Sequence, residues 1–270
     1  MELKDPVIDV YLQNAKSGHR AAQRSHAPRL AHRQAFEEAL RHYQISPEGL
    51  HILGETPFAV MVAPTSTGRN TIINELLKTG QYYFIVSDTT RPPRMNNGVM
   101  EQDGVEYFFR SEEDMLADIR AGLFVEAEII HSQQVSGVSI REIKRAHDQG
   151  KIAITDIEIL GGITVATLKP DAAAIYLLPP SFEEWIQRIQ GRTPLTDEEL
   201  RNRLRGAMKG FKLGLESDCF TFVINDKLKD AVRIVDEIAR LGVHHRHNEH
   251  VAKELARTLY HQTEAYLQKM

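Results

Sequence analysis

Between Pro57 and Leu241 the sequence alternates between short apolar runs and longer amphipathic segments, a pattern that limits the chain to few folds. The apolar runs are rich in β-branched and aromatic residues and predict strands at 58–63, 83–87, 151–159, 173–178 and 221–225. The segments between them predict helices at 71–80, 111–122, 139–150, 181–191, 196–211 and 230–242. Alternation of this kind indicates an α/β fold, a mostly parallel sheet with helices on both faces.

Helix start and stop signals support several of these predictions. Ser111 precedes a helix with Asp114 three residues later, and Thr196 with Glu199 forms a capping-box pattern. Gly80 and Gly150 follow two other helices, where glycine commonly ends a helix.

The composition describes an ordinary globular chain. It has 270 residues, 42% of them hydrophobic, and a formal net charge of −4. This charge argues against nucleic acid or an anionic membrane as the partner. The single cysteine, Cys219, excludes an internal disulfide and fits a reducing compartment. No signal-peptide core or membrane-length apolar run is present, so we expect a cytoplasmic protein.

The two ends differ from the middle and define our predicted domain boundaries. Residues 1–56 form a basic, partly helical extension, with five Lys or Arg, three His and no acid in the stretch 16–33. We interpret it as an arm or helix packed on the main domain, with an acidic partner as the alternative. Residues 243–270 form a helical C-terminal extension. Its four histidines (His244, His245, His247 and His250) lack a ligand frame, so we predict a polar linker and no metal site. Either extension offers a surface for a protein partner.

The stretch VMVAPTSTGRNTI, residues 60–72, predicts a strand, a turn of small residues and the start of a helix. A phosphate loop occupies such a place and follows the pattern G-x-x-x-x-G-K-[ST]. Only Gly68 matches a fixed position, while Arg69 replaces the lysine and keeps its charge. Ser66 would cost about 1–2 kcal/mol if its position requires a positive φ. The candidate ATP-binding residues of this loop are Ala63, Thr65, Ser66, Gly68, Arg69, Asn70 and Thr71.

The next segment, SDTTRPPR at residues 87–94, carries two arginines around a proline pair. The prolines favour a polyproline II backbone with three residues per turn, which projects Arg91 and Arg94 to the same side. Two guanidinium groups in that arrangement suit a phosphate monoester.

With these two segments in place, the sequence resembles the guanylate kinase family from about Phe58 to Leu241. The resemblance continues through EQDGVEYFF, GLFVEAE, ITDIEILGG, LLPPSFEEW, QGR, NRLRGA and VIND, in the family's order. It implies a P-loop nucleoside-monophosphate kinase fold at 57–242, with a monophosphate-binding subdomain at about 87–140 and a lid at about 186–213. It also implies phosphoryl transfer from ATP to GMP with Mg²⁺.

The resemblance assigns roles to residues that match the family's motifs. The matched GMP-binding positions are Ser87, Arg91, Arg94, Tyr107, Glu126, Asp156 and Glu158. Arg192 and Arg203 match lid arginines and join Arg69 as candidate catalytic residues, Arg188 is a further lid-region candidate, and Asn225 matches a residue near the adenine. The chemistry agrees, because carboxylates accept from the N–H groups of guanine and phosphoryl transfer needs charge neutralisation. Asp156 and Glu158 lie two apart on the predicted strand, so we expect them on one face.

Several positions depart from the family. Arg69 replaces the loop lysine, and the segment HSQQVSGVS (131–139) lacks the family's two tyrosines. Val138 stands where a base-contacting Ser or Thr is usual, Glu158 replaces an aspartate, and Leu160 replaces a glutamine. The insert MNNGVM between Arg94 and Glu101 is longer than usual. Three hypotheses follow: a diverged ATP:GMP kinase, a non-catalytic module that binds a nucleotide or a phosphorylated or acidic protein, and a kinase for another monophosphate.

Overall fold

The computed structural model describes residues 30–96, 99–130, 133–192, 195–242 and 246–270. The chain divides into two compact units, Met1–Leu53 with Val86–Ile143, and Gly54–Ile85 with Lys144–Met270. We call them unit 1 and unit 2 and describe each by itself. No helix in the described ranges combines the length and apolar character needed to span a bilayer.

Unit 2 is built on a five-stranded sheet in the order β11-β10-β1-β9-β2, and all its neighbouring strands are parallel. The strands are β1 (Phe58–Val62), β2 (Tyr82–Phe84), β9 (Ile152–Asp156), β10 (Ala173–Leu178) and β11 (Thr221–Ile224). Parallel strands buried on both faces read as continuous apolar runs, which explains why FAVMV in β1 is wholly buried. The predicted α/β fold with a parallel sheet is confirmed.

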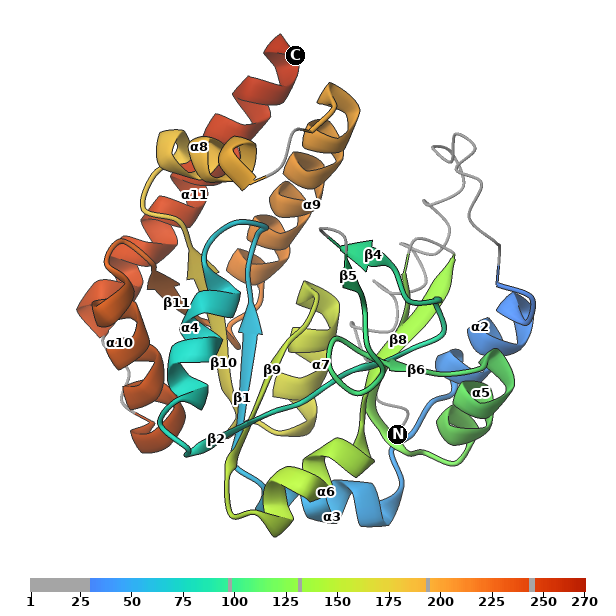
Figure 1. Ribbon diagram of the computed structural model, residues 1–270. Helices are drawn as coiled ribbons and strands as arrows, with labels where there is room; N and C mark the ends of the chain where they lie inside the picture. Colours follow the sequence, from blue (N-terminus) through green and yellow to red (C-terminus); the bar gives the residue numbers. More distant parts are fainter. Residues whose placement is uncertain (1–29, 97–98, 131–132, 193–194, 243–245) are drawn as a thin grey trace, which may run out of the picture. The chain divides into compact units, whose positions relative to one another are not determined.

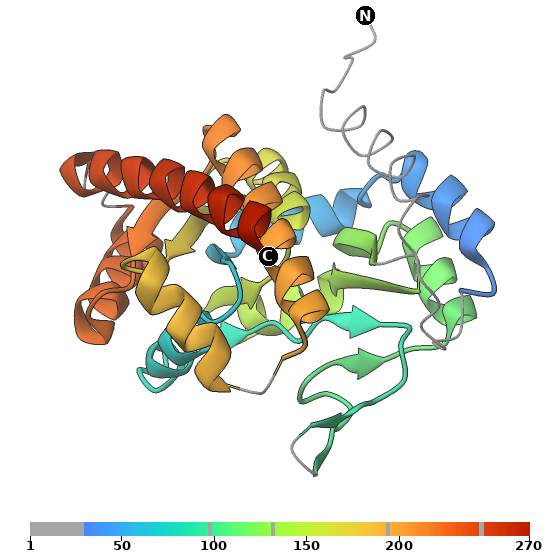
Figure 2. The ribbon, with the colours of Figure 1, turned by 90° about the horizontal axis from the view of Figure 1, so that it is seen from above.

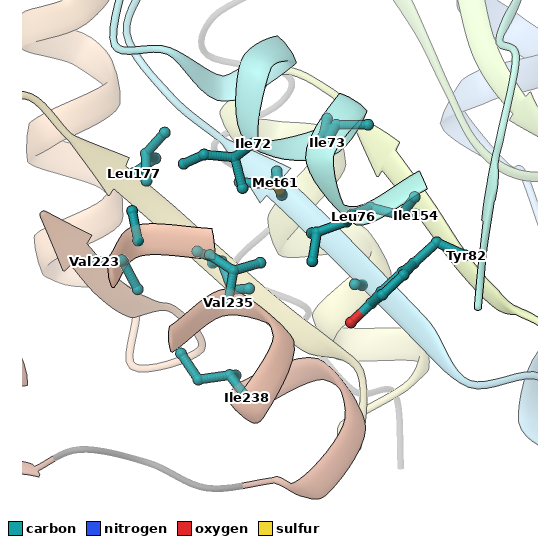
Figure 3. Close-up of a cluster of buried hydrophobic side chains, with 13 residues drawn as sticks. Met61, Ile72, Ile73, Leu76, Tyr82, Ile154, Leu177, Val223, Val235 and Ile238 are labelled. Carbon is teal, nitrogen blue, oxygen red and sulfur yellow. The ribbon is translucent and has the colours of Figure 1, made fainter. Parts of the chain in front are cut away.

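Helices cover both faces of this sheet (Figure 1). One face carries α4 (Arg69–Leu77) and α10 (Leu228–Leu241), and the other carries α7 (Ile159–Leu168) and α9 (Asp197–Glu216). Figure 3 shows Ile72 and Leu76 of α4 and Val235 of α10 pointing toward strand side chains, including those of Met61 and Leu177. This buried cluster fixes α4, and therefore the loop before it, against β1.

The C-terminal part of unit 2 adds α8 (Phe182–Arg192) and α11 (Arg246–Lys269). Figure 2 shows α11, in red, lying across the orange α9 and near the gold α8, and α11 also contacts β11. The predicted C-terminal helix is therefore present and packed. Of the four histidines weighed above, His244 and His245 and the side chain of His247 lie outside the described residues, and His250 is exposed on α11.

Unit 1 contains a four-stranded sheet in the order β6-β3-β8-β7. These strands are β3 (Asp88–Thr89), β6 (Phe108–Phe109), β7 (Phe124–Ile130) and β8 (Gln134–Ser139), and β7 pairs antiparallel with β8. The long insert forms strands β4 (Met95–Asn96) and β5 (Val99–Met100). Helices α2 (Arg33–Arg41), α3 (Pro47–Glu55), α5 (Glu112–Arg120) and α6 (Ile140–Asp148) complete the described elements, and the C-terminal ends of both α3 and α6 belong to unit 2.

The described part of the N-terminal extension belongs to the core of unit 1. Leu30 and Phe36 are buried in a cluster with residues of α5 and β7. The Tyr43 hydroxyl also exchanges hydrogen bonds with both the backbone N–H and the carbonyl of Phe124. Residues 1–29, which carry most of the predicted basic stretch, lie outside the described residues.

The helix caps agree with the signals in the sequence, whereas helix α7 (Ile159–Leu168) was not predicted. The Ser111 side chain accepts from the Asp114 N–H, and Thr196 and Glu199 form the reciprocal capping box. The predicted strand 151–159 is wrong at its end, because β9 stops at Asp156 and α7 begins at Ile159. The residues of α7 are apolar all round and include Gly161 and Gly162, so the segment lacks the one-sided pattern of a surface helix.

Candidate functional site

The candidate phosphate loop, residues 63–70, leaves the carboxyl end of β1 and enters α4. In open parallel sheets ligands bind at the carboxyl ends of the strands, and a helix N-terminus there favours an anion. Gly68 is the N-cap of α4 with φ of 91°, and Ser66 has φ of 63°. Ser66 is the one non-glycine residue with positive φ among the residues described, so the strain that the sequence analysis anticipated is present.

Two side chains hold the carbonyl groups of this loop. The Trp185 Nε1–H donates to the Thr65 carbonyl at 2.8 Å, and the Asn225 Nδ2–H donates to the Thr67 carbonyl at 2.7 Å. A Cβ at Gly68 would lie 2.4 Å from Asn225 Nδ2, so only glycine fits beside this contact. Because a trans peptide points its C=O and N–H in opposite directions, the Ser66 and Gly68 N–H groups face away from these donors. These two hydrogen bonds therefore fix the loop backbone from one side and leave the Ser66 and Gly68 N–H groups on the opposite side.

The role of Trp185 was missed by the sequence analysis. Trp185 is fully buried on α8, which is 120 residues away from Thr65 along the chain. Nothing in the segment LLPPSFEEW signals that its indole reaches the loop. Asn225 was assigned to the adenine region, and in the structure its amide contacts the loop backbone directly.

The loop arginine is paired with a carboxylate of the neighbouring strand. Met61 of β1 and Asp156 of β9 are register partners, so the end of β9 lies beside the start of the loop. Arg69 Nη2 donates to Asp156 Oδ2 at 2.6 Å, and both side chains are about a quarter exposed. Asp156 was predicted as a GMP-binding residue, and the structure brings it to the phosphate loop. Asn70 and Thr71, at the start of α4, are exposed.

The predicted same-face arrangement of Asp156 and Glu158 is not supported, because only Asp156 lies on the strand. Glu158 follows β9 as the extended N-cap of α7, with φ of −69° and ψ of 161°, and its side chain is exposed. The period-two rule for strands therefore does not apply to this pair.

The arginine turn, residues 87–94 of unit 1, holds the predicted phosphate-binding arginines. Arg91 is buried and forms a two-pronged ion pair with Glu101, with Nη–Oε distances of 2.5 and 3.0 Å. Glu101 also accepts from the Arg94 backbone N–H at 2.8 Å. One carboxylate therefore fixes both the Arg91 side chain and the turn that follows it.

The two arginines of the turn have different partners. The Arg91 guanidinium lies 4.6 Å from the Tyr107 ring centroid, a cation–π contact that adds to its ion pair. The exposed Arg94 side chain contacts Gln134 Oε1 at 3.4 Å. Ser87 is half-buried, and its carbonyl accepts from the Phe108 N–H at 2.9 Å. Thus the structure places Ser87, Arg91, Arg94 and Tyr107 in one unit.

A second ion-pair network lies beside this turn and was also missed. Asp88 is fully buried and accepts from Arg110 at 2.8 Å and from Arg141 at 2.7 Å. Arg110 also donates to Asp118 of α5 at 2.8 Å. These arginines come from distant segments, so no sequence spacing links them to Asp88.

Glu126, the predicted guanine-binding acid of unit 1, is buried on β7 next to a bulge between Phe124 and Glu126. Burial, with a smaller contribution from the nearby Glu128 charge, raises the pKa of Glu126 to about 8, and a hydrogen bond from the Val138 backbone partly opposes the shift. Val138 itself is fully buried. A perturbed buried carboxyl of this kind marks a functional-site candidate.

The predicted lid residues are described in part. Arg203 is exposed on α9, and the side chain of Arg192 lies outside the described residues. Arg188 donates to Glu184 at 2.6 Å and weakly to the Asn225 carbonyl. Ala63 and Thr65 are half-buried in the loop. No group of three or more His, Cys, Asp or Glu within the described ranges is arranged to hold a metal ion.

Comparisons with known proteins identify the family. The guanylate kinase family model matches residues 55–240. Guanylate kinase from Chlorobium luteolum is 35% identical over 178 residues, which cover 65% of this chain and 87% of that protein. Guanylate kinase from Corynebacterium diphtheriae is 32% identical over 190 residues, with 68% and 96% covered.

Two further matches show how far this similarity extends. Guanylate kinase 1 from Arabidopsis thaliana is 34% identical over 177 residues, 64% of this chain, but the match spans only 44% of that longer protein. The crystal structure of guanylate kinase from Anaplasma phagocytophilum superimposes with a TM-score of 0.52 at 22% identity, covering 70% of this chain and 87% of that one. The structural match supports the fold alone. The chain therefore belongs to the guanylate kinase family of phosphotransferases.

Proposed function

We propose that this protein transfers the γ-phosphoryl group of ATP to GMP and forms ADP and GDP. The observation that carries the proposal is the phosphate loop itself. Its conformation is fixed from outside by Trp185 and Asn225, and the buried Ser66 Oγ has no hydrogen-bond partner among the described residues. A buried hydroxyl without a partner is costly unless a ligand satisfies it, and a phosphate oxygen is a suitable acceptor.

On the donor side, the loop would bind the phosphates of ATP through backbone N–H groups and the N-terminus of α4. Arg69 would supply the charge that a lysine supplies in the usual pattern. To do so, its guanidinium would have to share or exchange the Asp156 carboxylate that it contacts at 2.6 Å. The exposed Arg203 and the lid position Arg192 would neutralise charge in the transition state, because phosphoryl transfer depends on such stabilisation.

Magnesium would accompany ATP. Mg²⁺ usually keeps several waters and binds through one or two carboxylates and the substrate phosphates, so a site of three protein ligands is not required. The Asp156 carboxylate beside the loop and the exposed Asn70 amide supply oxygen donors of the right kind. Bound magnesium would neutralise phosphate charge, while the chain's own residues orient the phosphates.

On the acceptor side, Arg91, Arg94, Ser87 and Tyr107 would bind the phosphate of GMP. Arg91 is already oriented by Glu101 and Tyr107, which lowers the cost of binding. The Glu126 carboxyl of unit 1 would accept a hydrogen bond from a guanine N–H group. The alternative functions remain a module that binds a nucleotide or an acidic or phosphorylated protein, and a kinase for another monophosphate.

The test is nucleoside-diphosphate formation from Mg-ATP and GMP by the purified chain. Arg69→Lys and the double variant Arg91→Ala with Arg94→Ala are measured alongside, and Arg120→Ala, exposed on α5, is the arginine control. We expect turnover in the wild type and the control, and loss of at least about a hundredfold in the double variant, as two charge-assisted contacts disappear.

The other outcomes distinguish the alternatives. Turnover that appears only in Arg69→Lys would mean that the natural loop is disabled. Turnover with a different monophosphate but not with GMP would favour the third hypothesis. No turnover with any monophosphate, together with no binding of ATP at millimolar concentration, would contradict the proposal and favour a binding module.

A further inference from the structure

A series of aromatic contacts connects the C-terminal helix α11 to the phosphate loop. The Tyr266 ring of α11 lies edge-on to Phe182, with ring centroids 5.5 Å apart. Phe182 lies edge-on to Trp185 at 6.1 Å, and the Trp185 indole donates to the Thr65 carbonyl. All four residues belong to unit 2. Edge-to-face geometry is the favourable arrangement for aromatic pairs, so each ring restrains the next.

Helix α11 is held in place by its own packing. Ala252, Ala256, Leu259 and Thr263 are buried along one side of α11, which contacts α9, α8 and β11 (Figure 2). Small residues on this side allow close approach of the helix backbones. Residues 246–270 lie beyond the segment 55–240 that matches the family model, so this support is additional to the family domain.

Trp185 contacts both the packed aromatic rings of α8 and α9 and the backbone of the phosphate loop. It is fully buried, and besides Phe182 it contacts the buried Phe211 of α9, with centroids 5.8 Å apart. Its indole position is therefore set by rings on α8 and α9, and through Phe182 by Tyr266. The strained Ser66, with φ of 63°, directly follows the carbonyl that the indole holds. A strained conformation persists only where its surroundings impose it.

We propose that α11 is a positioning element of the phosphate loop, and that Tyr266 acts on the loop through Phe182 and Trp185. Its significance for polyphosphate binding rests on the proposed function, but the positioning itself is a property of the ligand-free chain. Tyr266 touches no reacting group, so it is a positioning residue. The contact series predicts that a change on α11 alters the conformation of the phosphate loop and its affinity for ATP. The arginine turn of unit 1 should stay unchanged.

The experiment compares Tyr266→Ala with Tyr266→Phe and Tyr260→Ala in the full-length protein. Tyr266→Phe keeps the ring edge, and Tyr260→Ala makes the same truncation elsewhere on α11, where the ring contacts only His261 among the ring contacts described. Two measurements need no nucleotide. Hydrogen exchange reports the amides of residues 63–70, and the emission of Trp185 reports its surroundings, because Trp185 is the single tryptophan of the chain.

We expect the loop amides of Tyr266→Ala to exchange about two- to tenfold faster, the range that loss of one aromatic pair gives, with a shift in Trp185 emission. The affinity for inorganic tripolyphosphate and the KM for ATP should weaken by a similar factor, while the KM for GMP stays unchanged. Tyr266→Phe and Tyr260→Ala should match the wild type. If Tyr266→Ala fails to fold, Tyr266→Leu, which keeps bulk without a ring, takes its place.

Unchanged loop exchange and emission in the folded Tyr266→Ala or Tyr266→Leu variant would overturn the inference. Equal weakening of KM for ATP and GMP would also overturn it, because that result indicates general destabilisation. A wild-type chain that binds no tripolyphosphate, yet shows the expected exchange differences among variants, would contradict the proposed function and support the positioning role.

Discussion

Arg91 in the arginine turn and Arg69 in the phosphate loop are both paired with a carboxylate, but water reaches the two pairs to different extents. The Arg91 and Glu101 side chains are 8% and 6% exposed, whereas those of Arg69 and Asp156 are 25% and 23% exposed. The first pair has two contacts and an aromatic ring against it, and the second has one contact. A buried two-pronged pair fixes a side chain, whereas a partly solvated single contact exchanges at low cost.

This difference suggests two ways of presenting a cation to a phosphate. Under the proposed function, the arginine turn holds Arg91 in one orientation before GMP binds, so that little entropy would be lost on binding. The donor loop leaves Arg69 free to change partner, and its rigidity comes instead from the backbone contacts of Trp185 and Asn225. Of the four predictions below, the first and the last test whether the two pairs differ as their exposure implies, and the other two test the buried Glu126 carboxyl and the backbone of the phosphate loop.

The largest expected effect is that of Glu101→Gln. The substitution leaves the buried Arg91 charge without its partner and should lower the free energy of unfolding by about 3–5 kcal/mol, measured by urea denaturation. Glu38→Gln, an exposed position on α2, is the matched control and should change it by less than about 0.5 kcal/mol. A loss below about 1 kcal/mol for Glu101→Gln would mean that the Arg91–Glu101 pair contributes no more to stability than the partly exposed Arg69–Asp156 pair.

The second prediction concerns pH and Glu126. Burial raises the pKa of Glu126 from 4.5 to about 8, so the folded state binds a proton that the unfolded state releases. The stability contributed by this proton is fully present below pH 4.5 and is lost as the pH rises from 4.5 through about 8. The loss should be about 4 kcal/mol between about pH 5 and 9, with a slope of up to about 1.4 kcal/mol per pH unit.

The variant Glu126→Gln should lack this decline when its unfolding free energy is measured between pH 5 and 9. Glu128→Gln is the control, and it should keep most of the slope because burial is a larger cause of the shift than the Glu128 charge. Parallel pH profiles for the wild type and Glu126→Gln would show that this carboxyl titrates normally.

The sequence predicted those parts of the molecule whose signals are local. The five strands of unit 2 are apolar, β-rich runs, and the caps at Ser111 and Thr196 depend on residues three positions apart. Helix α7 was missed because its signal is not local. A Cβ at Gly162 would lie 2.7 Å from a Val62 side-chain carbon, so this glycine is required by packing against β1 and not by helix formation.

The candidate site likewise contains residues that the sequence predicted and residues that it did not. The loop, the arginine turn and Glu126 were predicted because their residues are contiguous or match motifs of the family. The partners that orient them were not, since Asp156 lies 87 residues from Arg69 and Trp185 lies 120 residues from Thr65. Only the register of β1 with β9 and the packing of α8 bring these groups together.

The third prediction tests the backbone of the donor loop. Ser66→Gly should relieve about 1–2 kcal/mol of left-handed strain, offset in part by the greater freedom of glycine in the unfolded chain. We expect a net gain of about 0.5–1 kcal/mol in the free energy of unfolding. Ser217→Gly, at φ of −95°, is the control and should lose stability. A loss in Ser66→Gly as well would mean that the Ser66 side chain contributes more than its strain costs.

The smallest expected effect on stability is that of Asp156→Asn, and it is the most direct test of the comparison. Since the pair with Arg69 is partly exposed and has one contact, the loss should be below about 1 kcal/mol, similar to that of Asp148→Asn, the control at the exposed pair with Lys144. Removing the competing carboxylate should also raise the affinity for metal-free tripolyphosphate about three- to tenfold, measured by calorimetry. A stability loss of about 3 kcal/mol, as for Glu101→Gln, would contradict the distinction, because Arg69 would then be as firmly held as Arg91. A small loss with unchanged affinity would show that Arg69 contributes nothing to anion binding, and the rigid backbone of the loop would have to account for it alone.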